Sequence, residues 1–289
     1  MRGWWQDLTD LVLPAECGGC GMSRTVLCRE CRAALSGAAP RRVRPVPEPP
    51  GLPVVHAAAR YEDEVRAALL AHKERGALTL ASPLGAALAG AVRAGLQQQG
   101  LRETTGVREC VLLVPVPSAR WAVRARGHDP ARRIALAAAR ELRRTGTPSR
   151  VVGVLRQRRA VADQSGLTAR QRLDNLAGAL EVADGGGRLL AGGRVVLVDD
   201  LMTTGASLRE AARAVREALE ETAVYGGVTG EVRARRIAGA TAATGVRSVR
   251  SAPGEVMDRS RAVPGKAAEN GAGYMIRAAV VAASPESFQ

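Results

Sequence analysis

The sequence predicts an α/β protein in which helices flank a parallel sheet, with a small cysteine-rich module ahead of it. Residues 111–114 and 195–198 form continuous apolar runs with polar boundaries, as expected for parallel strands buried on both faces. Stretches with helical spacing of apolar residues lie around these runs. A chain of 289 residues that is 46% hydrophobic can bury a substantial core, and with 2% aromatic residues that core consists mainly of Ala, Leu and Val.

The N-terminal module is defined by two pairs of cysteines. The pairs are Cys17-x-x-Cys20 and Cys28-x-x-Cys31, and the glycines around the first pair permit a tight knuckle. Four thiolates at this spacing favour a tetrahedral structural zinc, because they leave no open coordination position for catalysis. Two disulfides are the alternative, which a reducing compartment disfavours. Cys110 stands apart from these pairs and is interpreted as a small core residue.

The chain divides into five regions by composition and periodicity. Residues 36–53 are rich in Pro, Gly and Arg, and residues 223–273 are rich in Ala, Gly, Arg and Ser without regular spacing. The predicted regions are a zinc-binding module (1–38), a linker (39–53), the main domain (54–222), a disordered insertion (223–273) and a returning final strand with its tail (274–289). Within the main domain we expect strands at 54–61, 109–116, 151–156, 180–182 and 194–198, and helices at 64–71, 78–99, 130–144, 168–176 and 207–220.

A basic loop is expected after the strand at 109–116. It carries Arg120, Arg124 and Arg126, and it ends where Asp129 caps a helix that has Pro130 in its first turn. Arginines at the end of a buried strand suit contacts with pyrophosphate or with a nucleic-acid backbone. A solvated basic loop remains the alternative. His128 lies in the same loop, and we interpret it as a local hydrogen-bonding residue rather than a catalytic one.

A polar flap is expected before the strand at 194–198. Its candidate residues are Gln164, Arg172 and Asn175, and residues 168–176 are predicted to form a short helix within it. A mobile polar segment at this position would exclude water from a reactive ligand centre.

The strand at 194–198 leads into the most informative stretch of the chain. Asp199 and Asp200 follow it, and a loop of small and hydroxylated residues comes next: Thr203, Thr204, Gly205, Ala206 and Ser207. Backbone N–H groups at a helix N-terminus favour a phosphate, and two carboxylates beside them can accept hydrogen bonds from sugar hydroxyls. The pattern therefore predicts a site for a ribose 5-phosphate. A receiver domain and a generic Rossmann turn are the alternatives, but a receiver places its acidic pair at its first strand.

Residues 195–207 resemble the phosphoribosyl-pyrophosphate (PRPP) loop of type I phosphoribosyltransferases. The order of several segments further resembles the ComF family, phosphoribosyltransferase-like proteins linked in bacteria to DNA uptake and competence. The segments are the cysteine pairs, Tyr61 with residues 73–76, residues 114–117 with 124–127, residues 164–176, and the PRPP loop itself. The chain departs from the family at His128-Asp129-Pro130, where an aromatic residue and an amide are usual, and in the long stretch 223–273.

The resemblance implies a type I phosphoribosyltransferase-like sheet that binds PRPP with Mg²⁺. It implies a role in DNA uptake or nucleotide salvage by phosphoribosyl transfer, with single-stranded DNA and a competence-type helicase or DNA-processing proteins as partners. A non-catalytic protein that keeps the fold and handles single-stranded DNA is the alternative. A regulator that senses PRPP is a third reading, although no helix-turn-helix is evident.

Net charge and hydropathy bear on partners and location. The net charge of +14 suits an anionic partner, but nearly all of it is arginine in a chain rich in Ala, Gly and Val, a composition that GC-rich coding also produces. No apolar run reaches the roughly 18 to 20 residues needed to span a bilayer. Asp7 and Asp10 interrupt the segment where a signal peptide would be apolar. We therefore expect a cytoplasmic protein without a membrane span.

Overall fold

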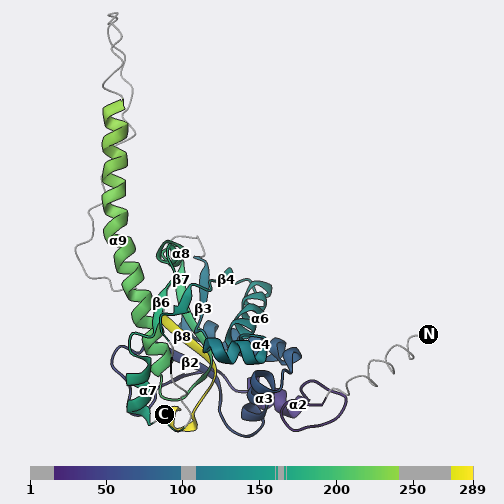
Figure 1. Ribbon diagram of the computed structural model, residues 1–289. Coiled ribbons are helices and arrows are strands. Elements are labelled where there is room, and N and C mark those ends of the chain that lie inside the picture. Colours follow the sequence, from purple (N-terminus) through teal and green to yellow (C-terminus); the bar gives the residue numbers. More distant parts are fainter. Residues whose placement is uncertain are drawn as a thin grey trace, which may run out of the picture.

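The computed structural model describes residues 16–98, 109–159, 161, 166, 168–240 and 275–288, with side chains described as far as residue 224 and again from residue 275. Helices cover both faces of a central sheet (Figure 1). The helical elements are α2 (Arg29–Ser36), α3 (Asp63–Glu74), the 3-10 helix η1 (Leu78–Leu80), α4 (Ala81–Gln97), α5 (Arg120–Arg126), α6 (Pro130–Arg144), α7 (Ala169–Leu176), α8 (Gly186–Leu190), α9 (Ala206–Ala240) and the 3-10 helix η3 (Pro285–Ser287). No helix in these ranges is long and apolar enough to cross a membrane.

The main sheet has six strands within the described residues, in the order β1-β2-β8-β7-β3-β4. β1 pairs antiparallel with β2, and all other neighbours in this sheet are parallel. A separate antiparallel pair is formed by β5 and β6. The strands are β1 (Arg41–Val43), β2 (Val54–Arg60), β3 (Val111–Pro115), β4 (Ser149–Val151), β5 (Leu155–Gln157), β6 (Leu180–Val182), β7 (Arg194–Met202) and β8 (Arg277–Ala283). The predicted class, a mostly parallel sheet flanked by helices, is confirmed.

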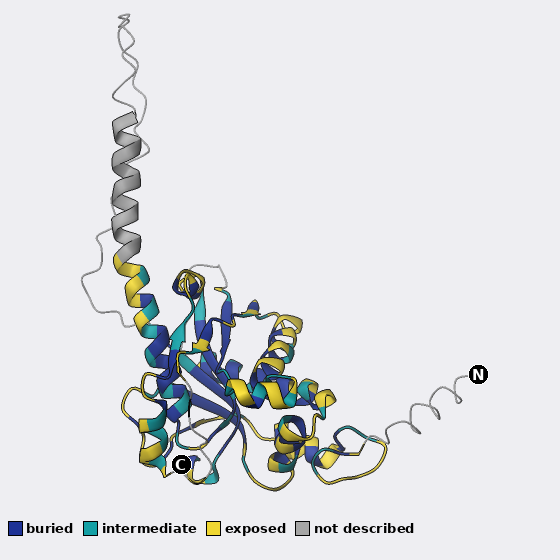
Figure 2. Ribbon diagram, viewed as in Figure 1, coloured by how far each residue is buried: buried dark blue, intermediate teal, exposed yellow. Residues whose placement is uncertain are grey.

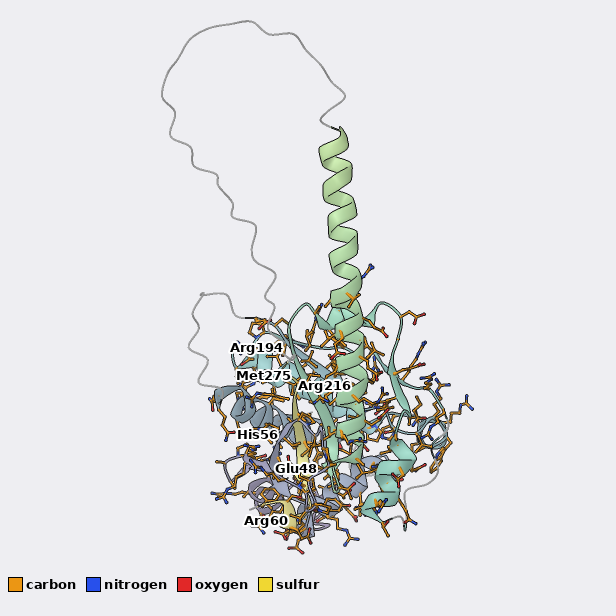
Figure 3. The ribbon with its side chains drawn as sticks, turned by 90° about the vertical axis from the view of Figure 1, so that its left-hand side faces the viewer. Glu48, His56, Arg60, Arg194, Arg216 and Met275 are labelled. Carbon is orange, nitrogen blue, oxygen red and sulfur yellow. The ribbon has the colours of Figure 1, made fainter. Side chains whose placement is uncertain are left out.

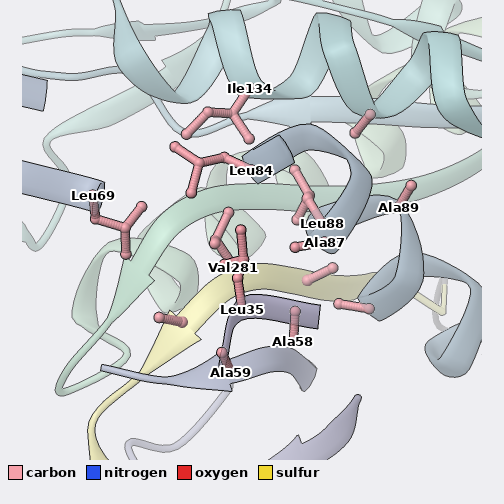
Figure 4. Packing of buried hydrophobic residues seen from close by; sticks show 14 of the residues in the cluster. Leu35, Ala58, Ala59, Leu69, Leu84, Ala87, Leu88, Ala89, Ile134 and Val281 are labelled. Carbon is pink, nitrogen blue, oxygen red and sulfur yellow. The ribbon is translucent and has the colours of Figure 1, made fainter. Parts of the chain in front are cut away.

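Each face of the sheet has its own apolar core. Side chains from α2, α3, α4 and α6 pack on one face, where Leu84, Leu88 and Ile134 meet Val281 of the sheet (Figure 4). The first turns of α9 cover the other face, where Leu208 joins a second cluster of buried residues. The central strands are therefore buried on both sides, while the outer faces of the helices are exposed (Figure 2). This arrangement is why β3 and β7 have continuous apolar runs rather than alternating ones.

Small residues let the first layer pack closely. A Cβ atom added to Gly85 of α4 would lie 2.4 Å from the Cβ of Ala137 of α6. The two helices are so close that there is no room for a side chain at Gly85. The alanine- and glycine-rich composition thus allows a tight core in a chain with few aromatic residues.

Several predicted boundaries are wrong, and strand pairing explains most of them. β7 continues to Met202 instead of ending at residue 198, because β8 pairs alongside it as far as the contact of Met202 with Ala283. The strand expected at 151–156 is split between β4 and β5, which belong to different sheets. Residues 180–182 pair with β5 and not with an edge of the main sheet. The region expected as a linker contains β1, which pairs with β2.

The two ends of the main domain also differ from expectation. The sequence predicts irregular chain from residue 223, whereas α9 continues as a helix to Ala240. The alanines and arginines of residues 231–240 favour helix, although the glycines between residues 226 and 230 do not. The rest of the predicted insertion, residues 241–273, lies outside the described residues. The final strand returns to the sheet as expected, and β8 lies between β2 and β7.

Candidate functional site

The four cysteines of the N-terminal module converge on one point. The Sγ atoms of Cys17, Cys20, Cys28 and Cys31 all lie within 4.8 Å of one another. The first pair lies in a turn closed by a hydrogen bond of 2.9 Å from the Gly21 N–H to the Cys17 carbonyl. The second pair begins α2. Two short CxxC segments of different local structure thus supply one cluster.

The geometry of this cluster suits a tetrahedral metal ion. Zinc–sulfur bonds of about 2.3 Å in a tetrahedron place the sulfurs roughly 3.8 Å apart, and the Sγ atoms of Cys20 and Cys28 lie 3.7 Å apart. Backbone N–H groups already donate to two sulfurs, from Cys28 to Cys17 Sγ at 3.3 Å and from Cys31 to Cys28 Sγ at 3.4 Å. Such donors stabilise thiolate ligands, and four close cysteines can hold a metal ion such as zinc.

The thiol of Cys17 has a lowered pKa. Burial alone would raise its pKa, but backbone N–H donors, with Cys28 the strongest, outweigh burial and lower the pKa to about 6. Burial raises the pKa of the Cys31 thiol. A divalent ion would be needed to hold all four sulfurs as thiolates at once.

The cysteine module is not a separate folding unit. Cys17, Cys28 and Cys31 belong to the same buried cluster as the helices of the main domain. A Cβ atom on Gly18 would lie 2.5 Å from Leu80 Cδ1 of η1, so the knuckle backbone packs directly on this element. Loss of the cluster would therefore disturb the first core layer as well.

A second candidate site lies at the carboxyl end of β7. Asp199 and Asp200 are the sixth and seventh residues of this strand, and the N–H of Asp200 donates to Asp199 Oδ1 at 2.9 Å. Burial and the neighbouring Asp200 carboxylate raise the pKa of Asp199 well above its usual range. Two adjacent carboxylates in a half-enclosed position bind protons, cations or sugar hydroxyls readily.

Lys73 also belongs to this site. The sequence predicts no role for it, although residues 73–76 are one of the segments that resemble the ComF family. Lys73 lies near the end of α3, and its Nζ is 3.3 Å from Asp200 Oδ2. The charge of Asp200 raises the pKa of Lys73, so the ammonium is retained at neutral pH. One signal was available: Lys73 is one of only two lysines in a chain with 42 basic residues.

The loop after β7 forms the turn into α9. Thr203, Thr204 and Gly205 connect the strand to the first residue of the helix, and Gly205 has a φ of +74°. A Cβ on Gly205 would approach Leu52 Cδ1 to 3.0 Å, so both conformation and space favour glycine there. The first-turn N–H groups of a helix have no intrahelical partner and favour an anion.

A cavity of about 320 Å³ joins these groups. Lys73, Arg126, Asp199, Asp200, Thr203 and Ser207 give it a polar wall, and Val116, Pro117, Trp121, Val161 and Leu176 give it an apolar one. Thr204, Gly205 and Ala206 are not among the lining residues, and Ala206 is buried below the loop. The cavity therefore brings together part of the predicted loop, both predicted acids and Lys73.

The predicted basic loop is wrong in conformation: residues 120–126 form helix α5, which ends at Gly127 with φ +74°. Of its arginines, only Arg126 lines the cavity. Arg126 also makes a bidentate ion pair with Glu74, with contacts of 3.0 and 2.8 Å. Arg120 donates to the carbonyl of Gln157 at 3.2 Å, and Arg124 is exposed. Gly127 in the sequence is consistent with a helix that ends there, because glycine is the residue most often found in the left-handed conformation after a helix.

The predicted flap is described only in part. Gln164 lies outside the described residues. Arg172 and Asn175 lie on α7, which begins with a capping box between Thr168 and Gln171. Neither side chain lines the cavity, although Leu176 at the end of the same helix does. The Nε atom of Arg172 is buried, and it has no hydrogen-bond partner in the described part of the chain.

His128 has a local hydrogen-bonding position. Its Nδ1 lies 3.1 Å from the carbonyl of Arg126 and its Nε2 lies 3.3 Å from the carbonyl of His72. The two imidazole rings meet edge to face, with centroids 5.8 Å apart. These contacts tie the end of α5 to α3, which positions Lys73 and Arg126 beside each other.

A larger cavity, of about 390 Å³, lies at the opposite end of the sheet. Arg194 and Met275 line it, and Figure 3 shows them at that end, with Arg60 at the other. Its walls are mainly apolar, and its acid, Glu109, is already paired with Arg194 at 3.0 Å. The chemistry-bearing groups thus gather around the smaller cavity.

Comparison of the chain with models of known protein families finds no match. Comparison with curated proteins finds no match either. Function is therefore inferred from the residues of the two sites.

Proposed function

We propose that this protein binds PRPP with Mg²⁺ in the cavity at the end of β7 and transfers its phosphoribosyl group, as the resemblance to ComF-type phosphoribosyltransferases implies. The observation that carries the proposal is the meeting of Asp199, Asp200 and Lys73 in one cavity with the hydroxylated loop that begins α9. A ribose 5-phosphate needs acceptors for its hydroxyls beside donors for its phosphate, and in this cavity two carboxylates lie with Thr203 and Ser207.

Each wall of the cavity has a role in the proposed binding mode. Thr203 and Ser207, the residues of the loop that line the cavity, receive the 5-phosphate through N–H and hydroxyl donors. Asp199 and Asp200 accept hydrogen bonds from the ribose hydroxyls. The pyrophosphate lies toward Lys73 and Arg126, the two cations of the lining. Arg120 and Arg124 lie outside this lining, so the pyrophosphate role proposed for the three arginines narrows to Arg126.

The transfer breaks the bond between the ribose anomeric carbon and a pyrophosphate oxygen and forms a bond from that carbon to the acceptor, and pyrophosphate leaves with the electron pair of the broken bond. Mg²⁺, when bound, neutralises charge on the leaving pyrophosphate. The ammonium of Lys73 and the guanidinium of Arg126 hold the same oxygens as negative charge grows on them. Helix α7, whose Leu176 lines the cavity, would help to exclude water from the oxocarbenium-like centre.

We further propose that the cysteine cluster holds a structural zinc ion. The sulfur separation, the N–H donors and the burial of three of the four cysteines support this identity. A four-thiolate site has no open position for a substrate. Its role is to fix the knuckle on η1 and on the first core layer.

The test is a calorimetric titration with Mg²⁺-PRPP. The double variant Asp199→Asn, Asp200→Asn should lose measurable binding, because both carboxylates become uncharged amides, which are weaker acceptors for the sugar hydroxyls. The matched control is the double variant Glu48→Gln, Glu109→Gln, which removes the same charge from exposed ion pairs. Unchanged affinity in the first variant would refute the proposal, as would equal loss in both.

The alternative, a non-catalytic protein that handles single-stranded DNA, is favoured by a different observation. Arg132, Arg133 and Arg140 are all exposed on the solvent face of α6. Binding through such residues falls steeply with salt. Salt-sensitive DNA binding that persists after loss of the acidic pair, without pyrophosphate release from PRPP in the wild type, would favour this alternative.

A further inference from the structure

Trp121 is an exposed aromatic residue in the wall of the cavity. It is the second residue of α5, and 58% of its surface is exposed. The chain has only three tryptophans, and the other two, Trp4 and Trp5, lie outside the described residues. A tryptophan so exposed forgoes much of the stabilisation that its burial would give. Its position beside a binding cavity provides a reason other than core packing.

The cavity around Trp121 is divided by chemistry. The end of β7 and the following loop contribute carboxylates and hydroxyls, whereas the side formed after β3 presents Val116, Pro117 and Trp121. The phosphate, ribose and pyrophosphate of PRPP are all polar, so contacts with them do not explain the apolar wall. A flat indole face instead suits a flat, weakly solvated ring that stacks on it.

The helix that carries Trp121 is held at both ends. At its start, the backbone N–H of Arg120 donates to Gln157 Oε1 at 3.3 Å, and its guanidinium donates to the Gln157 carbonyl at 3.2 Å. At its end, Arg126 is clamped by Glu74. Ala122, next to Trp121, is buried. The indole therefore stands on a fixed base, and ordering it on a ligand costs little.

We propose that Trp121 determines which acceptor this site accepts, by stacking on a flat heteroaromatic ring that the phosphoribosyl group joins. The inference rests on the proposed function for the position of the ribose. It assigns to Trp121 a specificity role in that site.

The experiment separates the ring from the ribose phosphate. Dissociation constants are measured for ribose 5-phosphate, for a panel of purine and pyrimidine nucleoside 5′-monophosphates, and for 5,6-dihydrouridine 5′-monophosphate, whose ring is not aromatic. In the wild type, at least one nucleotide should bind about 10-fold or more tighter than ribose 5-phosphate, the range that stacking of one base provides. Reduction of the uracil ring should remove any preference for the uridine nucleotide.

Substitutions then assign the effect to the indole. Trp121→Ala should lose about 10-fold for the preferred nucleotide and leave ribose 5-phosphate affinity unchanged, while Trp121→Phe should retain most of the preference. The matched control is Leu136→Ala, an exposed apolar residue of α6, which should change neither constant. Nucleotide binding should also quench a part of the tryptophan fluorescence that Trp121→Phe removes.

The outcomes distinguish the two proposals. If ribose 5-phosphate binds but no nucleotide binds more tightly, or if Trp121→Ala leaves the preference intact, the stacking role is wrong and the PRPP site stands. If neither ribose 5-phosphate nor PRPP binds to the wild type, the proposed function fails and the role of Trp121 fails with it.

Discussion

Replacing Glu210 with alanine should destabilise the protein far more than replacing Glu217, although both side chains pair with Arg213. Glu210 lies in the second turn of α9 and is 1% exposed. It accepts hydrogen bonds from the Leu180 N–H at 3.1 Å and from Arg213 at 2.9 and 2.8 Å. Arg213 also donates to the Leu180 carbonyl at 2.7 Å. The pair therefore anchors β6 to α9, the helix that follows β7.

The magnitude follows from what the variant leaves behind. Loss of Glu210 leaves the buried Leu180 N–H without its acceptor, which costs about 1–3 kcal/mol. Breaking a fully buried ion pair would cost more than this. Arg213 is partly exposed and keeps its ion pair with Glu217, so the loss of the pair with Glu210 adds little to the total. We expect a total of about 2–4 kcal/mol, or a fall in Tm of roughly 4–16 °C. Glu217→Ala removes an exposed pair and should cost less than about 1 kcal/mol.

The assay is urea denaturation followed by circular dichroism, repeated across pH. Burial raises the pKa of Glu210, but the Arg213 guanidinium and the Leu180 N–H outweigh burial and hold it below its usual value of 4.5. A carboxyl group whose pKa is lower in the folded state stabilises the protein at pH values above its unfolded-state pKa. This stabilisation is lost as pH falls through the folded-state pKa. The difference between wild type and Glu210→Ala should therefore shrink in acid. Equal losses in the Glu210 and Glu217 variants at neutral pH would refute the reasoning.

Three further predictions concern the acids, the metal and the core. Burial and its acidic neighbour raise the pKa of Asp199, so ionisation of Asp199 lowers the stability of the ligand-free protein as pH rises. Affinity for Mg²⁺-PRPP should increase over the same pH range, because the ionised carboxylate is the stronger acceptor. In calorimetric titrations, the affinity of Asp199→Asn should therefore depend less on pH than that of the wild type. Cys31→Ser should reduce bound zinc from about one ion per chain, measured by elemental analysis, and lower Tm because Cys31 is buried in the core. Gly85→Ala should destabilise by about 1–3 kcal/mol in urea denaturation because of the 2.4 Å approach to Ala137, whereas Gly90→Ala on the same helix should be close to neutral.

The sequence predicts the parts of this structure that depend on local pattern. The run at 195–198 predicts a strand buried on both faces, and both cores contain residues of it. The CxxC spacing predicts a converging cluster, which the four sulfurs form. Asp129 with Pro130 predicts a helix start, and Asp129 Oδ1 accepts from the Arg132 N–H at 3.1 Å. Each of these signals is complete within a short segment.

The parts that the sequence does not predict depend on partners far along the chain. The extension of β7 to Met202 requires β8, and no pattern within residues 199–202 indicates it. Lys73 reaches Asp200 only because α3 follows β2 and returns along the sheet, so its role could not be read from its neighbours. The arginines of α5 lie in a basic stretch in which charge suggests a loop, while pairing of Arg126 with Glu74 depends on the tertiary arrangement.

The position of β8 explains why the acidic site needs the last strand of the chain. β8 lies between β2 and β7, and it pairs with Asp199 through Val280 and with Leu201 through Ala282. Its other edge pairs with β2, whose chain continues into α3 and Lys73. The strand therefore sets the separation of the lysine-bearing and acid-bearing elements. A cation and two carboxylates converge in this cavity because the most C-terminal strand is inserted between two earlier ones, so the site forms only when the whole sheet has assembled.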